Sequence, residues 1–167
     1  MNLFTKRLNQ SGVTLVETLV VMGLLSIMLI ILATIFTSAA DVQQQTKSYS
    51  ATTINGRFIM TRLNFDIAQA RLVSAPSSLG STSATLLINV NGLLNTYTLS
   101  GNDLQLTENS NTDNLNSNDV SISNLSFQKL GNIGGKPTIN YSFTVSSNAK
   151  SHGSADIQTF TGTAGLK

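Results

Sequence analysis

Hydrophobic residues are concentrated in one stretch near the start of the chain. Of the 24 residues in Val13–Phe36, 18 are apolar, and Leu19–Phe36 contains no charged residue. At 1.5 Å per residue, those last 18 residues would form a helix about 27 Å long, close to the hydrocarbon thickness of a bilayer. The pattern therefore predicts a membrane-spanning helix over residues 13–36.

The residues that flank this stretch suggest its orientation and leave three explanations open. Lys6 and Arg7 precede it, and basic residues favour the cytoplasmic side of a membrane helix, so residues 1–12 are expected to be cytoplasmic. The stretch could be a cleaved secretory signal, a plain single-span anchor or a helix that follows a short cleaved leader. Ser38-Ala39-Ala40 is spaced like a signal-peptidase site, but the stretch exceeds the roughly 7–15 apolar residues typical of secretory signals.

Residues 37–75 are predicted to continue the helix, because they contain no proline and a single glycine, Gly56. Asp41–Thr53 is polar, which indicates an exposed helical neck or a hinge. Arg62 and Asp66 are spaced to pair on the exposed side. Beyond the neck, apolar positions recur every three or four residues and predict one broad apolar face. That face contains Ile54, Phe58, Ile59, Thr61, Leu63, Phe65, Ile67, Ala68 and Leu72.

Pro76 and the Ser- and Gly-containing residues after it end the helical pattern, and from Thr82 onward the period changes to the alternation of β-strands. Asn91-Gly92 lies between two alternating runs and predicts a tight hairpin. A change of parity near Asn124 predicts a bulge, and Ile139–Val145 alternates cleanly. The expected fold is α+β, with a long N-terminal helix on an antiparallel sheet of about six strands over residues 76–167.

Charge is scarce, which excludes several classes of function. Charged residues make up 11% of the chain, with 10 Lys and Arg against 8 Asp and Glu. This is too few basic residues for a nucleic-acid-binding face that neutralises many phosphates. The absence of cysteine excludes disulfides and thiolate metal sites. Removing residues 1–12 would take away Lys6 and Arg7 and leave eight basic and eight acidic side chains.

No group of residues in the sequence indicates catalysis, so the chain is not expected to be an enzyme or to need a cofactor. His152 stands alone in a loop, and Gly131–Lys136 resembles a phosphate loop but connects two expected strands. Asn109, Asn111 and Asp113 alternate like the start of a calcium loop, but the glycine and the terminal glutamate of such loops are missing. We therefore favour an ordinary Asn-rich turn over a calcium site.

The segment Lys6-Arg7 … Gly12-Val13-Thr14-Leu15-Val16-Glu17 resembles the N-terminus of type IV pilins and type II secretion pseudopilins. Prepilins of that family have a short basic leader ending in glycine, then an apolar residue, Thr-Leu and a glutamate at the fifth mature position. The resemblance implies that a prepilin peptidase cleaves after Gly12 and that the new amine of Val13 is methylated.

Glu17 is the one acid within the apolar stretch. A carboxylate at the centre of a bilayer costs about 2.5–3.5 kcal/mol, so it needs a partner. The ammonium of a mature Val13 in a neighbouring subunit would supply one and fix the register of the two helices. The alternative is a carboxylate solvated at the level of the lipid headgroups, and the resemblance favours the pairing.

Arg57–Ala70 resembles the amphipathic helix of J-type pseudopilins and W-type minor pilins. This resemblance implies a minor subunit that helps to prime or cap a filament in a type IV pilus, a type II secretion system or a competence pilus. The implied partners are other pilins, the prepilin peptidase, an inner-membrane assembly platform and an assembly ATPase. The chain would span the bacterial cytoplasmic membrane once before it enters the extracytoplasmic filament. The alternative is a membrane-anchored extracytoplasmic binding domain that does not polymerise.

Overall fold

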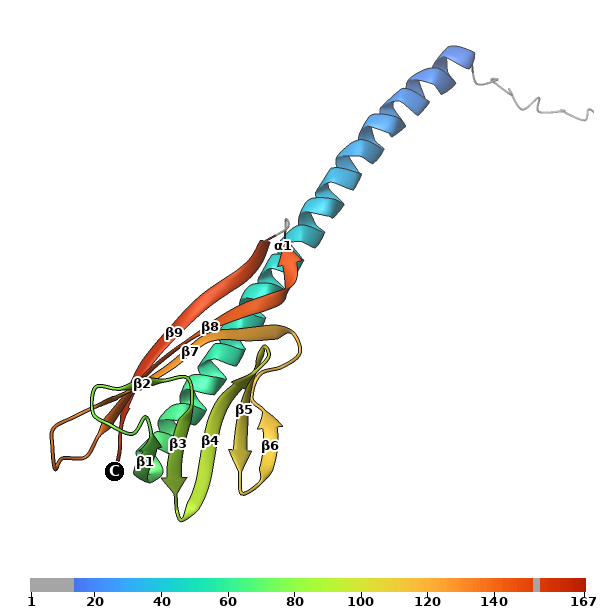
Figure 1. Ribbon diagram of the computed structural model, residues 1–167. Coiled ribbons are helices and arrows are strands. Elements are labelled where there is room, and N and C mark those ends of the chain that lie inside the picture. The colour runs from blue at the N-terminus through green and yellow to red at the C-terminus, as the bar shows by residue number, and fades with distance from the viewer. Residues whose placement is uncertain (1–13, 152–153) are drawn as a thin grey trace, which may run out of the picture. The chain divides into compact units, whose positions relative to one another are not determined.

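The computed structural model describes residues 14–151 and 154–167, apart from the side chains of Lys150 and Ser151. The chain divides into two compact units, residues 1–40 and residues 41–167. One helix and nine strands make up the described part, and Figure 1 labels them. They are α1 (Leu15–Gln69), β1 (Ala70–Ala75), β2 (Thr82–Ser83), β3 (Leu86–Val90), β4 (Leu93–Ser100), β5 (Asp103–Glu108), β6 (Asn111–Asn114), β7 (Val120–Leu130), β8 (Thr138–Ser151) and β9 (Ser154–Gly165).

In the first unit, the described residues are helical from Leu15 onward, as predicted. The hydroxyl groups within the apolar stretch bond to their own helix. Ser26 Oγ donates to Met22 O at 2.8 Å, and Thr34 Oγ1 donates to Ile30 O at 2.9 Å. These bonds satisfy polar side chains that have no water partner inside a bilayer.

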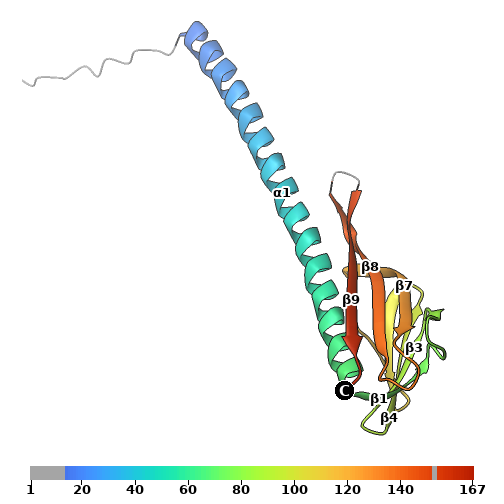
Figure 2. The ribbon, with the colours of Figure 1, turned by 90° about the vertical axis from the view of Figure 1, so that its left-hand side faces the viewer.

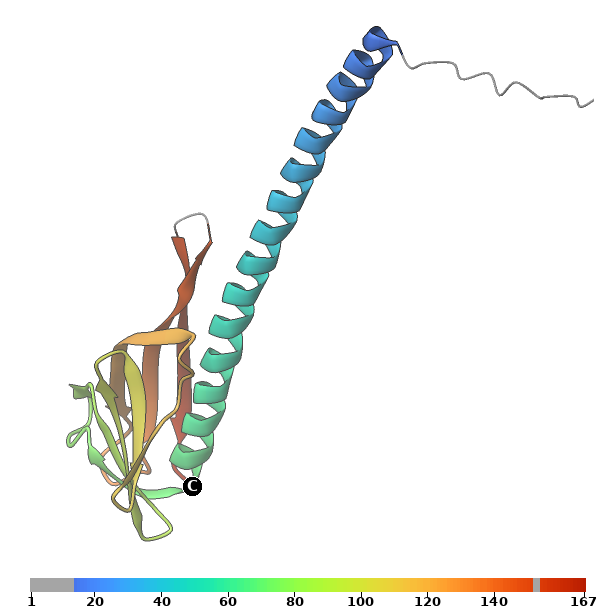
Figure 3. The same cartoon turned by 90° about the vertical axis from the view of Figure 1, so that its right-hand side faces the viewer.

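The second unit is an α+β domain with two antiparallel sheets, which confirms the predicted fold class. The strand order is β1-β3-β4-β5-β6 in one sheet and β2-β7-β8-β9 in the other. Within this unit both sheets lie on the same side of α1 (Figures 2 and 3). The sequence predicted one sheet of about six strands. It missed β1, which was assigned to the helix, and β2 and β6, which have too few residues to show an alternating pattern.

The helix ends at Gln69, earlier than the predicted Ala75. Ala70–Ala75 instead forms β1, which pairs with β3 in the register Val73↔Ile88. Ala70 and Val73 are buried, and a spacing of three residues fits a helical face. No glycine or proline lies between Gln69 and Pro76, so the change from helix to strand is set by pairing with β3.

Only part of the predicted apolar face of α1 packs against the sheets. Ile59, Leu63 and Ile67 are fully buried, whereas Ile54, Phe58 and Phe65 are more than half exposed. These two groups were predicted to form one face. At 3.6 residues per turn the two groups lie on nearly opposite faces of the helix, and the sheets cover only one of those faces.

The polar segment Asp41–Thr53 is a regular part of α1. Of the two alternatives that its composition left open, the structure has the helical neck and not the hinge. The buried face of the helix continues into this region through small residues, Ser48, Thr52 and Gly56. They are small because the sheet approaches closely: a Cβ atom on Gly56 would overlap the ring of Phe160 in β9.

Asp66 links α1 to the five-stranded sheet. Its carboxylate accepts hydrogen bonds from the Tyr97 hydroxyl and from Arg62 Nε, the latter at 2.9 Å. Arg62 also bonds to Glu108 at the end of β5. The Arg62–Asp66 pair was predicted on the exposed side, but Asp66 is 2% exposed. Burial, and then the bond to Asp66, raises the pKa of Tyr97, so its hydroxyl keeps the proton that it donates.

Other polar contacts link α1 to the four-stranded sheet. The Tyr141 hydroxyl donates to Asn64 Oδ1 at 2.8 Å. Asp156 in β9 accepts hydrogen bonds from Thr52 Oγ1 and, at 2.9 Å, from Gln158 Nε2. These contacts satisfy polar groups at the helix–sheet interface, where an unpaired donor or acceptor would be costly.

The predicted turns are confirmed. Asn91 and Gly92 have φ values of 53° and 89° and join β3 to β4, as expected for a two-residue hairpin. Asn124 has φ of 52° and lies where the β7–β8 register shifts. The run Ile139–Val145 lies in β8 and alternates between the core and the outer face.

The Tyr97–Asp66 bond predicts a measurable loss of stability. Tyr97→Phe should lower the free energy of unfolding by about 1.5–3 kcal/mol, because a buried carboxylate loses a donor. The matched control is Tyr141→Phe, which removes a neutral hydrogen bond and should cost about 0.5–1.5 kcal/mol. Urea unfolding of the full chain in detergent micelles compares the two variants. Equal losses would contradict the assigned importance of the Asp66 contact.

The raised pKa values of Tyr97 and Tyr141 predict that stability falls at alkaline pH. Above the ordinary tyrosine pKa of about 10, the unfolded chain releases these protons while the folded chain retains them. The unfolding free energy should therefore be unaffected by these groups below pH 10 and should fall as the pH rises above it. Melting temperatures between pH 8 and 11 measure the effect. The fall should be smaller in Tyr97→Phe, and an equal fall would contradict the assignment.

Candidate functional site

The candidate site is the beginning of α1. Thr14 precedes the first helical residue, and its Oγ1 accepts a hydrogen bond from Glu17 N at 3.3 Å. Thr18 N donates to Thr14 O at 3.2 Å, which is the first backbone bond of the helix. Thr14 is therefore the N-cap residue, and Glu17 occupies the third helical position.

This arrangement gives Glu17 a role within its own helix. Thr14-Leu15-Val16-Glu17 has the spacing of a capping box, in which threonine is followed three residues later by glutamate. A carboxylate in the first turn also interacts favourably with the partial positive charge of the helix N-terminus. The T-x-x-E spacing is the signal in the sequence that indicates this position.

Gly12 and Val13, the predicted cleavage and methylation positions, lie outside the described residues. Their roles stay predictions, as does the pairing of Glu17 with a neighbouring chain. His152 also lies outside the described residues.

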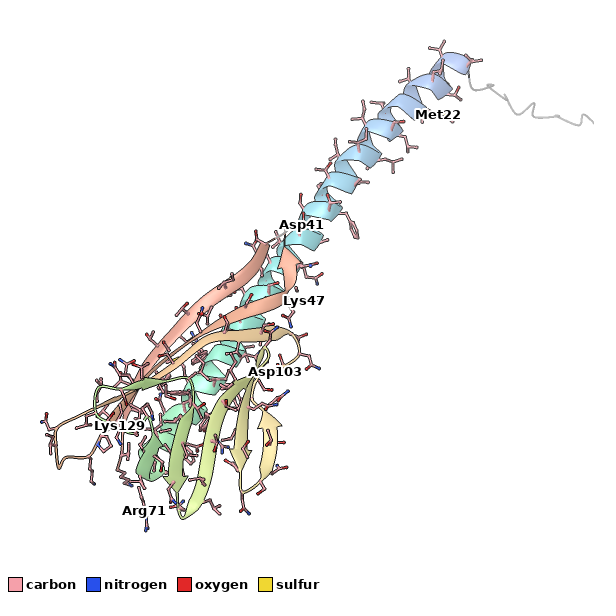
Figure 4. The ribbon with its side chains drawn as sticks, viewed as in Figure 1. Met22, Asp41, Lys47, Arg71, Asp103 and Lys129 are labelled. Atoms are coloured by element: carbon pink, nitrogen blue, oxygen red, sulfur yellow. The ribbon has the colours of Figure 1, made fainter. Side chains whose placement is uncertain are left out.

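The apolar stretch that follows is not covered by other described residues of the first unit. Every large apolar side chain from Leu15 to Phe36 is between 50% and 76% exposed. Met22 is labelled among these side chains in Figure 4. In the part of the chain that the structure describes, α1 is the helix long and apolar enough to cross a membrane. A continuous apolar surface of this length needs lipid or other helices around it.

The three weak calcium candidates lie in the hairpin between β5 and β6. Asn109 and Ser110 form its turn, with φ values of 45° and 73°. Asn111 and Asp113 lie in β6, where Asn111 Nδ2 donates to Asp113 Oδ2 at 2.9 Å. Among the described residues, no three His, Cys, Asp or Glu side chains are grouped to hold a metal ion. The hairpin geometry accounts for the Asn-rich composition of this segment.

Comparison with known proteins bears directly on the start of the chain. Residues 7–33 match the family model described as the prokaryotic N-terminal methylation motif. The matched range includes Gly12, Val13 and Glu17 together with most of the apolar stretch. No curated protein and no solved structure matches the chain.

The methylation motif is consistent with the type IV pilin and pseudopilin family. Together with the apolar helix, it supports a membrane-anchored protein of the pilin or pseudopilin type. The motif implies processing by a prepilin peptidase and assembly with other pilins, and proteins of this type are structural. The match covers the beginning of the chain and does not extend to the β domain.

Proposed function

We propose that the chain is a minor pilin or pseudopilin, a structural subunit of an extracytoplasmic filament. The observation that carries the proposal is the methylation motif at residues 7–33. The motif overlaps the start of an apolar helix whose large side chains are at least half exposed. Before assembly, residues 13–36 hold the subunit in the cytoplasmic membrane. Lys6 and Arg7 favour an N-terminus in the cytoplasm and a β domain on the opposite side.

Processing would change the electrostatics at the start of α1. Cleavage after Gly12 creates an ammonium at Val13, directly before the N-cap residue Thr14 and four residues before Glu17. Glu17 then pairs with the methylated ammonium of Val13 in a neighbouring subunit. Charge-assisted hydrogen bonds of this kind are stronger than neutral ones, particularly where water is excluded. The pair would set the axial register between the helices of adjacent subunits.

The minor position in the filament is the more specific part of the proposal. It is supported by the likeness of Arg57–Ala70 to J-type pseudopilins and W-type minor pilins, whose role is to prime or cap filaments. The partners would be other pilins, the prepilin peptidase and the inner-membrane assembly platform. The filament would be a type IV pilus, a secretion pseudopilus or a competence pilus. No catalytic role is proposed for the β domain.

Substitutions at Glu17 separate the proposed pairing from the capping role. Glu17→Gln keeps a capping-box residue at the third helical position but removes the charge. It should insert in the membrane normally and enter filaments at least about tenfold less than the wild type, since a charge-assisted bond contributes about 1.5–3 kcal/mol. Incorporation is measured by immunoblotting of sheared filaments against the membrane fraction.

The matched control is Thr14→Ala, which removes the cap and leaves the charge of Glu17. This variant should enter filaments at close to the wild-type level. Normal incorporation of Glu17→Gln together with loss of Thr14→Ala would show that Glu17 acts through capping. If no variant and no wild-type chain enters a filament, the protein is a membrane-anchored domain that does not polymerise.

A further inference from the structure

Basic side chains gather at the end of the second unit where α1 finishes. Arg71 lies two residues after the last helical residue, Gln69, and it lies at the same end of the unit as Lys129 of β7 (Figure 4). Arg71 borders two hollows: the first is also lined by Lys129, and the second by Lys167. Lys136 belongs to the loop that forms one wall of the first hollow. Arg71 and the three lysines together are called the basic end.

This positive charge is not balanced by the acidic side chains that the structure describes. The basic end contains four of the seven Lys and Arg side chains that are described. Among the described residues, no Asp or Glu lines either hollow. Arg71 and Lys136 are exposed, and neither forms an ion pair with a described carboxylate. The basic end therefore presents a positive potential to an anionic partner.

Lys129 is held in place by the fold. Its Nζ donates to Val73 O in β1 at 3.1 Å and to Ser77 O at 3.2 Å. An ammonium group has three donors, so one donor remains for a ligand. Because the two carbonyl bonds already fix this ammonium, an anion can bind beside it at a small cost in side-chain entropy.

A glycine-rich loop keeps the first hollow open. The loop joins β7 to β8 and opens no helix, although Gly131–Lys136 resembles a phosphate loop in sequence. Gly134 lines the hollow with a φ of 81°, a value that glycine adopts without strain. A Cβ atom at Gly134 would meet no described atom within 4 Å. The loop therefore contributes a wall without bulky side chains next to two cations.

The rest of the first hollow is largely apolar. Leu72, Leu79, Pro137 and Leu166 line it beside the cations. Its volume is about 240 Å³, below the range of sites for drug-sized ligands. Apolar side chains next to an arginine are typical of the surfaces by which proteins bind each other. The hollow therefore fits one apolar side chain whose neighbour carries a carboxylate.

We propose that the basic end is a docking surface for an acidic segment of another protein. A carboxylate of that segment binds the guanidinium of Arg71, which can donate two parallel hydrogen bonds to it. Lys129 and Lys167 add positive charge from the two hollows, and an apolar side chain of the segment enters the first hollow. This inference goes beyond the proposed function, because the surface belongs to the second unit and does not require a filament.

Two observations favour a protein over a nucleic acid as the partner. Among the residues that line the two hollows, none is aromatic, whereas single-stranded nucleic acids bind by stacking bases on aromatic side chains. The four basic side chains can neutralise only a few phosphates, and such contacts weaken steeply as salt rises. An acidic protein segment uses the apolar lining as well as the charge, so it accounts for both features of the surface.

Fluorescence anisotropy with the full-length chain in non-ionic detergent micelles tests the proposal, with empty micelles as the blank. The probe is a labelled peptide of alternating glutamate and leucine. One matched peptide has glutamine in place of glutamate, another has serine in place of leucine, and labelled oligothymidylate represents a nucleic acid. The glutamate–leucine peptide should bind most tightly. Raising NaCl from about 50 to about 500 mM should weaken its binding at least about tenfold, because salt screens exposed charges.

Substitutions locate the binding on the surface. Arg71→Gln should weaken binding of the glutamate–leucine peptide at least about tenfold, because the two charge-assisted hydrogen bonds to the carboxylate are lost. The matched control is Arg57→Gln, which removes an exposed arginine from α1 and changes the net charge equally. The control should leave the affinity within about twofold of the wild type. Urea unfolding checks that both variants are as stable as the wild type.

Equal binding of the glutamate and glutamine peptides would overturn the proposal, as would equal losses in Arg71→Gln and Arg57→Gln. Tighter binding of oligothymidylate than of the glutamate–leucine peptide would replace the protein partner by a nucleic acid. Equal binding of the leucine and serine peptides would contradict the role of the first hollow. Because binding is measured on the unassembled chain, these results are independent of filament entry, which the Glu17 variants test.

Discussion

The packing of one face of α1 is the constraint on which the domain depends, because both sheets are held by it. Small residues from Ser48 to Gly56 allow β9 to approach closely, and Ile59, Leu63 and Ile67 fill the core between the helix and the strands. Each sheet also has its own polar link, through Asp66 to Tyr97 and through Asn64 to Tyr141. A helix with a uniform apolar face could not meet both requirements.

Features set by local sequence were predictable, and those set by tertiary pairing were not. The apolar stretch, the Asn91-Gly92 hairpin and the bulge at Asn124 follow from composition and backbone preference. The end of the helix does not, because Ala70–Ala75 fits a helical face until β3 is present to pair with it. The burial of Asp66 likewise depends on its hydrogen bond with Tyr97. Tyr97 is distant in sequence, so the pattern of apolar residues along the helix does not indicate this contact.

The candidate site also combines features that the sequence indicates with one that it does not. The register of Gly12, Val13 and Glu17 can be recognised from the sequence, and the match at residues 7–33 covers all three. The capping geometry of Thr14 also has a sequence signature. The proposed partner of Glu17 lies in a second chain. Neither the sequence nor the structure of a single chain therefore shows it. The scarcity of charge has a structural counterpart: exposed positions of the long strand β9 carry hydroxyl groups, as at Thr159, Thr161 and Thr163. Such surfaces can adjoin without like-charge repulsion.

The central claim is that this chain is a processed, membrane-anchored subunit of a filament. Mass spectrometry of the chain purified from membranes tests it most directly, because processing fixes both the first residue and the mass of the N-terminal peptide. We expect a chain that begins at Val13 and carries one added methyl group on its amine. A chain that begins at Met1 or at Asp41 would contradict it.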